Sequence, residues 1–168
     1  MTYSVGVVMD PIQTIKVQKD STLAMLLEAQ RRQCPLWYME QRDLELLDGR
    51  CMARMRPLAV RDDPDDWFSL GEARTQALDR LDVVLMRKDP PFDMEYVYTT
   101  YLLEQAQARG SLIVNRPSAL RDANEKLYTA WFPEVCSPTL VSRRHAEFDR
   151  FIDTHRDVIL KPLDGMGG

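Results

Sequence analysis

The sequence has few cysteines: Cys34, Cys51 and Cys136 are its three. Their number is odd, their spacings are long and no C-x-x-C pair occurs. This usage argues against a disulfide framework and against a zinc site. Because free thiols persist in reducing compartments, we expect a cytoplasmic protein.

Long apolar runs and basic stripes are missing too. No stretch approaches the roughly 18–20 apolar residues that a membrane span needs. The apolar run at residues 5–9 (VGVVM) is too short for a signal peptide and has no basic residue before it. The net charge is -4, with both signs spread along the chain, so nothing indicates a nucleic-acid surface. We therefore expect neither a membrane nor a nucleic acid as a partner.

Several catalytic and metal-binding patterns are also absent. The sequence contains no G-x-S-x-G, no P-loop and no G-x-G-x-x-G dinucleotide motif. Its two histidines, His145 and His155, are too far apart to share one face of a helix. Because no third ligand is near them, we expect no metal site in this chain.

Four short apolar runs are present, at residues 5–9, 83–86, 112–114 and 158–160. Their apolarity is continuous rather than alternating, which is typical of strands covered on both faces in a parallel sheet. Amphipathic helical patterns lie between the runs. This alternation of strand and helix predicts an α/β fold.

Two of the expected helices have clear ends. The first is predicted over residues 20–32, with Asp20 or Ser21 as its N-cap. Its apolar side carries Leu23, Leu26 and Leu27. The second begins after the N-cap Asp93 and ends at Gly110, a residue suited to a helix C-terminus. The apolar residues that recur at helical spacing in it are Met94, Tyr98, Tyr101, Leu102 and Ala108.

The middle of the chain departs from this alternation. Residues 43–60 contain apolar segments on both sides of Asp48-Gly49, a dipeptide typical of a β-hairpin turn. Residues 61–66 are acidic and contain Pro64, so we expect a surface loop. Trp67 and Phe68 then return to the core. We interpret the section as an insertion or edge hairpin on the α/β domain.

The region after Val114 has shorter predicted elements. Pro117 can open a helix at its first position, and Asn124 can cap a second helix over residues 125–132. A strand is predicted at residues 139–141. Ser142 is the expected cap of a last helix, whose buried side would carry Phe148, Phe151, Ile152 and His155. A domain boundary is predicted near Arg121, which divides the chain into residues 1–121 and 122–168.

Polar side chains follow three of the predicted strands. Ligands of open α/β sheets bind beyond the carboxyl ends of the strands. If the strands are parallel, four residues converge there: Asp10, Arg87, Asp89 and Asn115. Arg87 is the strongest candidate, because a guanidinium can hold a carboxylate with two parallel hydrogen bonds. The alternative is that strands simply end in polar loops.

Three of the chain's seven glycines fall in its last four residues. Residues 161–168 read KPLDGMGG and follow a predicted strand. A glycine-rich loop lets backbone N–H groups approach phosphate oxygens, and Lys161 could neutralise their charge. A frayed terminus or a cloning remnant is the alternative, above all for Gly167 and Gly168.

Lys126 lies in the first turn of the helix expected after Asn124. A cation at this end of a helix is mildly unfavourable against the helix dipole. Either the neighbouring Glu125 or an anionic ligand could offset it, and the sequence leaves both open.

Five segments together resemble bacterial glutathione synthetase, of the ATP-grasp superfamily. They are residues 8–12 (VMDPI), 21–32 (STLAMLLEAQRR), 85–92 (LMRKDPPF), 120–132 (LRDANEKLYTAWF) and 159–168 (ILKPLDGMGG). The segments keep the family's order through the whole chain. The resemblance implies a Rossmann-like (pre-ATP-grasp) open sheet with flanking helices, followed by the start of an ATP-grasp domain.

The resemblance also implies a reaction, in which ATP and Mg²⁺ drive the joining of γ-glutamylcysteine to glycine through an acyl phosphate. Lys126 and Lys161 match the family's two ATP-contacting lysines. The start of its glycine-rich loop over the phosphates matches Asp164, Gly165, Met166, Gly167 and Gly168. Arg87, and with it Asp10 and Asn115, match the dipeptide side of the cleft. Homo-oligomers are implied as well.

The family's Mg²⁺ ligands, its adenine pocket and most of its glycine site are expected beyond Gly168. We therefore expect the 168-residue chain to be inactive alone. Two other classes remain open: a non-catalytic Rossmann-like binding module, and an oligomerisation module that uses the hairpin at residues 43–60.

Overall fold

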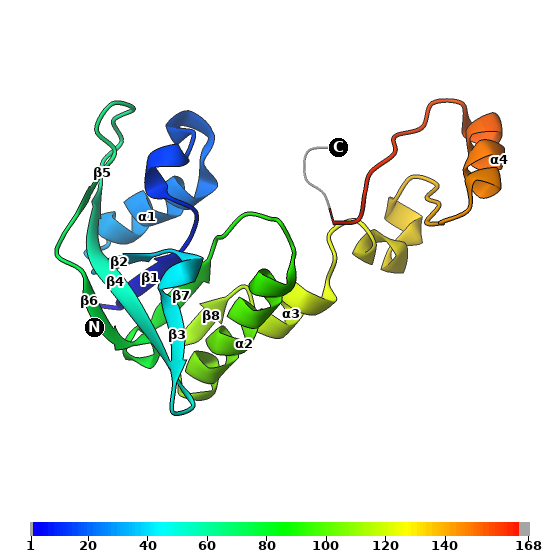
Figure 1. Ribbon diagram of the computed structural model, residues 1–168. Coiled ribbons are helices and arrows are strands. Elements are labelled where there is room, and N and C mark those ends of the chain that lie inside the picture. The colour runs from blue at the N-terminus through cyan, green and yellow to red at the C-terminus, as the bar shows by residue number, and fades with distance from the viewer. Residues whose placement is uncertain (1, 165–168) are drawn as a thin grey trace.

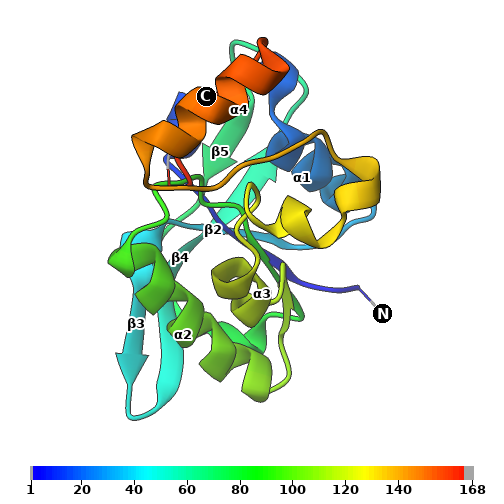
Figure 2. The same cartoon turned by 90° about the vertical axis from the view of Figure 1, so that its right-hand side faces the viewer.

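A computed structural model describes residues 2–164 of the chain (Figure 1). Residues up to Asp122 form a curled sheet flanked by helices. Residues 123–164, which we call the C-terminal arm, leave this body and extend away from it. Figure 2 views the molecule along the direction in which the arm projects.

The sheet has eight strands, with the path β3-β4-β2-β1-β7-β8 and with β5 and β6 also paired to β4. β1 is parallel to β2 and to β7, and β7 is parallel to β8. β4 is antiparallel to each of its neighbours. The bounds are β1 Val5–Val8, β2 Leu36–Met39, β3 Leu44–Leu47, β4 Arg50–Val60, β5 Phe68–Leu70, β6 Arg74–Ala77, β7 Val83–Met86 and β8 Leu112–Val114.

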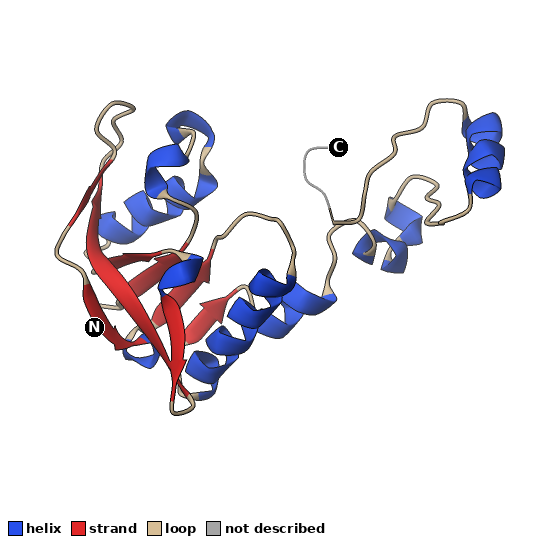
Figure 3. Cartoon of the chain, viewed as in Figure 1, coloured by secondary structure: helices blue, strands red, loops and turns tan. Residues whose placement is uncertain are grey.

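The α-helices are α1 Ser21–Arg31, α2 Met94–Ala108, α3 Pro117–Asp122 and α4 His145–His155. Short 3-10 turns occupy Ile12–Thr14, Val17–Lys19, Gln41–Asp43, Leu78–Arg80, Tyr128–Trp131 and Pro133–Val135. Figure 3 shows the helices lying around the sheet and α4 standing apart from it. Across residues 2–164, none of the helices combines the length and the apolarity needed to cross a membrane.

The four parallel strands confirm the α/β prediction. Their spatial order, β2-β1-β7-β8, is that of a Rossmann-like open sheet in which the strand order reverses between β1 and β7. Three of the four apolar runs predicted as strands are β1, β7 and β8. The gap between the carboxyl ends of β1 and β7 is therefore the place where such sheets bind ligands.

Two apolar cores cover the two faces of the sheet, because successive strand residues point to opposite sides. On one face Val7 packs with Leu23 and Leu26 of α1. On the other face Val8 packs with Leu103 of α2. The continuous apolarity of β1 thus reflects a strand that is buried on both faces.

The helix ends agree with prediction, whereas the buried face of α2 does not. Asp20 and Asp93 cap α1 and α2, and Gly110 follows α2 with a positive φ of 114°. The residues that α2 buries are Tyr96, Thr99, Thr100, Leu103 and Ala106, and Met94, Tyr98 and Tyr101 are at least half exposed. Two threonines can be buried because their hydroxyls donate to helix carbonyls, those of Glu95 and Val97.

Removal of the α2 cap is expected to destabilise the body. The Asp93 Oδ1 atom accepts a 2.9 Å hydrogen bond from the backbone N–H of Tyr96. Asp93→Ala should therefore lower the free energy of unfolding by about 1 kcal/mol. Asp93→Asn, which keeps the acceptor oxygen, should stay close to wild type. Urea titration followed by circular dichroism measures both, and equal losses in the two variants would contradict a capping role.

The middle section is an edge hairpin, as the sequence predicts. β3 and β4 pair in antiparallel register through the turn at Asp48 and Gly49, whose φ values of 49° and 72° are both positive. β3 forms one end of the main sheet path. β2, β5 and β6 are additional strands that the apolar runs did not predict. They pair with β1 or with the long strand β4.

The C-terminal arm contradicts four local predictions. Neither residues 139–141 nor residues 158–160 form a strand. Asn124 caps a turn followed by the 3-10 turn Tyr128–Trp131, not an α-helix, and the N-cap of α4 is Arg144, not Ser142. No residue of positions 123–164 is buried, and Ile159 is 79% exposed. A strand needs a hydrogen-bonding neighbour and a core to cover it, and this part of the described chain provides neither.

All three cysteines are free thiols, in agreement with the absence of a disulfide framework. Cys51 lies in the α2-side core, where burial, with a smaller effect from Asp79, raises the pKa of its thiol to about 12. At pH 8 Cys51 should therefore resist alkylation in the native state, while Cys34 and Cys136, which are only partly buried, react. Mass spectrometry after iodoacetamide treatment would show two labelled cysteines in the native chain and three in urea. Native labelling of Cys51 at the rate of the other two would contradict its burial.

Candidate functional site

The carboxyl ends of β1 and β7 are tied together by Asp10. One of its carboxylate oxygens lies 2.9 Å from the Lys88 ammonium. The other accepts a 2.9 Å hydrogen bond from the backbone N–H of Asp89. Both oxygens of Asp10 are thus engaged by the loop that leads from β7 to α2.

Arg87 is directed to the other face of the sheet. Its Nε and Nη2 donate to the hydroxyls of Thr22 and Ser21, at 3.0 and 2.9 Å, at the start of α1. Since successive residues alternate between faces, Arg87 follows the α1 side and Lys88 the α2 side. The strand ends meet at one edge, but their side chains diverge from there.

Asn115 follows β8 and borders a different space. This space, which we call the α2–α3 cavity, has a volume of about 530 Å³ and lies between the start of α2, the β8–α3 segment and residues 163–164. Its apolar wall includes Pro90, Phe92, Ala119 and Leu120. Asp10, Arg87 and Asn115 therefore occupy three separate positions along the carboxyl edge.

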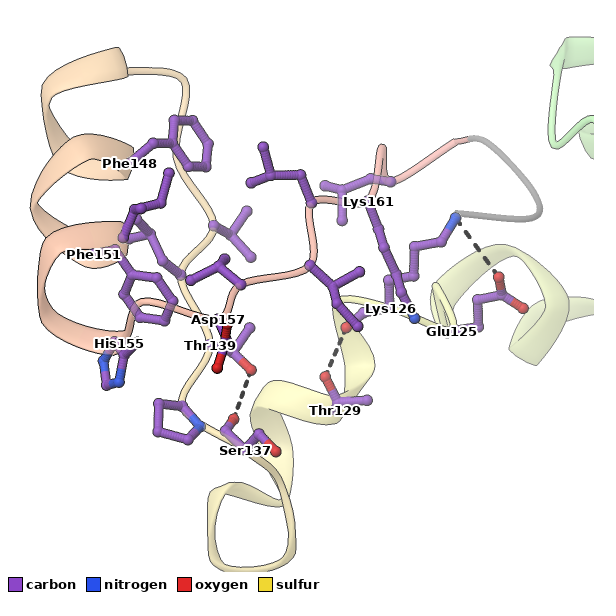
Figure 4. A pocket seen from close by; sticks show the side chains of 18 residues that line it. Glu125, Lys126, Thr129, Ser137, Thr139, Phe148, Phe151, His155, Asp157 and Lys161 are labelled. Carbon is purple, nitrogen blue, oxygen red and sulfur yellow. Dashed lines mark hydrogen bonds and ion pairs between the residues drawn. The ribbon is translucent and has the colours of Figure 1, made fainter.

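The C-terminal arm encloses a second space of about 590 Å³, the arm cavity (Figure 4). Phe148 and Phe151 of α4 lie at one end of it. The side chains of Lys126 and Lys161 lie at the opposite end. The structure thus brings together two lysines that are 35 positions apart in the sequence.

Lys126 borders both the α2–α3 cavity and the arm cavity. Its ammonium lies 3.7 Å from a carboxylate oxygen of Glu125, and its side chain is 17% exposed. Glu125 and Leu163 also line both spaces. A cation therefore stands where two neighbouring cavities meet.

Asn124 fixes the backbone around Lys126. Its Oδ1 accepts 3.0 Å hydrogen bonds from the N–H groups of Lys126 and Leu127. Its Nδ2 donates to the carbonyl of Leu163 at 2.9 Å. One amide side chain thereby joins the turn that carries Lys126 to the segment that precedes the glycine-rich end.

This arrangement gives a measurable expectation for Asn124. In Asn124→Ala, the amide hydrogens of Lys126 and Leu127 should exchange with solvent roughly fivefold faster, because each loses one acceptor. Asn124→Asp keeps the acceptor and loses the bond to Leu163, so its exchange rates should remain near wild type. Hydrogen exchange by NMR measures all three proteins. Faster exchange in the aspartate variant, to the same extent as in alanine, would contradict the assigned bonds.

Two aromatic residues of the α2–α3 cavity were not among the residues predicted from the sequence. Phe92 and Tyr96 pack with ring centroids 5.4 Å apart. The Tyr96 ring is buried, and this burial raises the pKa of its phenol, so the hydroxyl is a hydrogen-bond donor at neutral pH. The sequence did offer a signal in their position, because Phe92 precedes the N-cap Asp93 and Tyr96 lies in the first turn of the helix that follows β7.

The glycine-rich end is described in part. Asp164 lines the α2–α3 cavity. Gly165, Met166, Gly167 and Gly168 lie outside the described residues. Among residues 2–164, no group of three or more His, Cys, Asp or Glu side chains could hold a metal ion.

Comparisons with known proteins give one family. The model of the prokaryotic glutathione synthetase N-terminal domain matches residues 3–121, and that of the prokaryotic glutathione synthetase ATP-grasp domain matches residues 125–168. Among curated relatives, the glutathione synthetase of Pseudomonas putida is 60% identical over the whole chain and is covered over 53% of its own length. That of Citrobacter rodentium is 55% identical over 97% of this chain and 52% of its own length.

The glutathione synthetase of Vibrio vulnificus is 52% identical over the whole chain, which covers 53% of that relative. The chain thus spans about half the length of the curated relatives it matches. The match of two domain models in sequence order agrees with the Rossmann-like body and the arm that follows it. The chain therefore belongs to the prokaryotic glutathione synthetase family.

Proposed function

We propose that this chain contributes the dipeptide side and part of the nucleotide side of an ATP-dependent carboxylate–amine ligase that joins γ-glutamylcysteine to glycine. The observation that supports this most directly is the position of Lys126 between two cavities. A ligase of this class must bring a nucleotide phosphate and a carboxylate together at one point. A cation that borders both spaces suits that point.

In the proposed reaction, an oxygen of the cysteinyl carboxylate attacks the γ-phosphorus of ATP and the bond to the ADP oxygen breaks. The glycine amine then attacks the acyl carbon, loses a proton, and inorganic phosphate departs. Lys126 and Lys161 would hold the phosphoryl oxygens through charge-assisted hydrogen bonds. Positioning and charge neutralisation supply most of the catalysis in such transfers.

The remaining assignments follow the same division. We propose residues 1–121 as the Rossmann-like domain and residues 122–168 as the beginning of the ATP-grasp domain. Asp164 to Gly168 would cover the phosphates. Arg87 and Asn115 would contact the dipeptide, whereas Asp10, with both carboxylate oxygens engaged, would hold the loop after β7.

Mg²⁺ and the compartment are part of the proposal as well. Bound with ATP, Mg²⁺ would neutralise phosphate charge. The three free thiols favour the reducing cytoplasm. A homo-oligomer is proposed by family resemblance.

The test separates binding from turnover. Calorimetric titration with ATP and with γ-glutamylcysteine should detect at least one of them, while an assay for ADP release with both substrates and glycine should show no turnover by the 168-residue chain. Turnover would overturn the proposed inactivity. Binding of neither ligand would favour an oligomerisation module. Measuring the oligomeric state of a variant altered in the hairpin at residues 43–60 would then test that alternative.

A further inference from the structure

The short helix α3 connects the body to the C-terminal arm (Figure 1). Beyond it, the described residues 127–164 make no hydrogen bond or ion pair with residues 2–122. The direction in which the arm leaves the body therefore depends largely on how α3 is held.

Arg121 holds α3 against α2. Its Nη1 donates to the hydroxyl of Thr100 at 2.9 Å, and its Nη2 donates to a carboxylate oxygen of Glu104 at 2.5 Å. Its guanidinium carbon lies 4.5 Å from the centroid of the Tyr101 ring, within the range of a cation–π contact. Within the described chain, no other side chain of α3 makes a hydrogen bond or an ion pair. One side chain thus contacts three residues of α2.

The helix α3 has few other contacts that could fix its orientation. It has six residues, too few for a helix that is stable by itself, and Pro117 is its buried residue. Leu120 is partly buried against the α2-side core. Thr100 is fully buried, and its hydroxyl donates to the carbonyl of Val97 while it accepts from Arg121. A fully paired buried polar group is directional, so it specifies one orientation more sharply than apolar packing does.

The orientation of α3 is passed on to the lysine of the arm. The N–H of Ala123 donates to the carbonyl of Ala119 at 2.9 Å, which ties the first residue after α3 to the helix. Asn124 follows directly and holds both the turn of Lys126 and the carbonyl of Leu163. A rotation of α3 on α2 would therefore move Lys126 relative to the strand ends.

We propose that Arg121 is a positioning residue of the ligase. By holding α3 on α2, it sets where Lys126 and Lys161 stand relative to Arg87 at the carboxyl edge of the sheet. This rests on the proposed function, in which a phosphate held by the arm must meet a carboxylate held by the body. Arg121 acts through α3 and contacts neither substrate. Such positioning matters because a misplacement of about 1 Å between reacting groups can cost roughly 100-fold in rate.

The chain's own cysteines allow the distance between body and arm to be measured. Cys34 lies in the body and Cys136 in the arm, and both are partly exposed, whereas Cys51 is buried. Nitroxide labels on Cys34 and Cys136 give a distance distribution by pulsed electron paramagnetic resonance. Wild type should give one narrow distribution. In Arg121→Met the distribution should become about twice as broad, because the residues at the end of α3 can then act as a hinge.

Two further variants separate positioning from a loss of folding. Arg121→Lys keeps a cation for Glu104 and Tyr101, so its distribution should lie between those of wild type and Arg121→Met. Glu104→Gln should broaden the distribution less than Arg121→Met does, because the contacts with Thr100 and Tyr101 remain. Circular dichroism of each variant checks that the body stays folded. Arg54→Met is the matched control, since Arg54 is an exposed arginine of β4 and its loss changes the net charge equally.

Calorimetric titration with ATP gives the second readout. Arg121→Met should bind ATP as wild type does, because the bonds of Asn124 that hold Lys126 lie within the arm. Weaker ATP binding at an unchanged distance would make Arg121 part of the nucleotide site and overturn the positioning role. A broad wild-type distribution, a narrow one in Arg121→Met, or equal broadening in Arg54→Met would also overturn it and leave the proposed function standing. Absence of ATP binding by wild type would count against the proposed function, while the distances would still decide whether Arg121 directs the arm.

Discussion

Replacement of Leu103 by alanine is expected to lower the free energy of unfolding of the body by about 2–5 kcal/mol. Leu103 is fully buried and packs in the α2-side core with residues of β1, β7 and β8. Its truncation removes apolar contacts and leaves a cavity that the surrounding strands cannot close, since Val8 and Val84 are themselves fully buried. The loss would be a large part of the ~5–15 kcal/mol typical of a whole domain.

Urea unfolding followed by fluorescence measures this effect on the body. Trp37 and Trp67 lie in the body, whereas Trp131 is 64% exposed in the arm and should report little of the transition. Leu112→Ala is the control, because Leu112 is the same residue type at 59% exposure. Its effect should stay within about 0.5 kcal/mol. A similar loss in both variants would mean that α2 does not cover the sheet as described.

Part of the body could be predicted from the sequence, because helix caps depend on contacts a few residues apart and a strand that is buried on both faces is apolar at every position. Asp20 and Asp93 cap helices through contacts three residues away, and the apolar run of β1 reflects burial on both faces. The inward face of α2 could not be predicted in this way. Thr99 and Thr100 read as polar, but their hydroxyls are satisfied by helix carbonyls and, for Thr100, by a bond from Arg121.

The arm shows the opposite case. Residues 158–160 have the composition of a strand, yet Ile159 and Leu160 are mostly exposed and unpaired in the described chain. Strand formation depends on a neighbour that can be distant in sequence, so composition alone does not establish it. The proximity of Lys126 and Lys161 likewise depends on contacts that are distant in sequence. The family resemblance implied that both contact ATP, and the fold brings both to the arm cavity.

The diverging side chains at the strand ends have a simpler reason. Arg87 and Lys88 are consecutive, and consecutive strand residues face opposite ways. Which of the two reaches the α2 side therefore depends on which residues of β7, the odd-numbered or the even-numbered ones, face α2. Met86 belongs to the α2-side core, which puts Lys88 on that side and Arg87 beside Ser21 and Thr22. The sequence alone does not tell which set of residues faces α2, because that depends on the register of β7 against β1.

Substitution of Lys126 by methionine is expected to weaken ATP binding by the chain roughly 10- to 100-fold, the effect of losing a hydrogen bond from a charged group to phosphate. Methionine keeps most of the length and apolar stem, so packing beside Leu163 and Glu125 should change little. If Lys126 and Lys161 hold the same phosphoryl group, the double variant should lose less than the sum of the single losses, expressed as free energies. Separate phosphoryl groups would give additive losses.

Lys19→Met is the matched control, since Lys19 is an exposed lysine beside α1 and lines neither the arm cavity nor the α2–α3 cavity. It changes the net charge equally, so it should reproduce any general electrostatic effect and nothing more. Titration at two salt concentrations separates the effects further, because long-range attraction is screened while a direct contact is less so. If Lys19→Met weakened ATP binding as strongly as Lys126→Met, the attraction would belong to the protein's overall charge. A selective loss in Lys126→Met would place the phosphates at the junction of the two cavities, where the dipeptide carboxylate must also arrive.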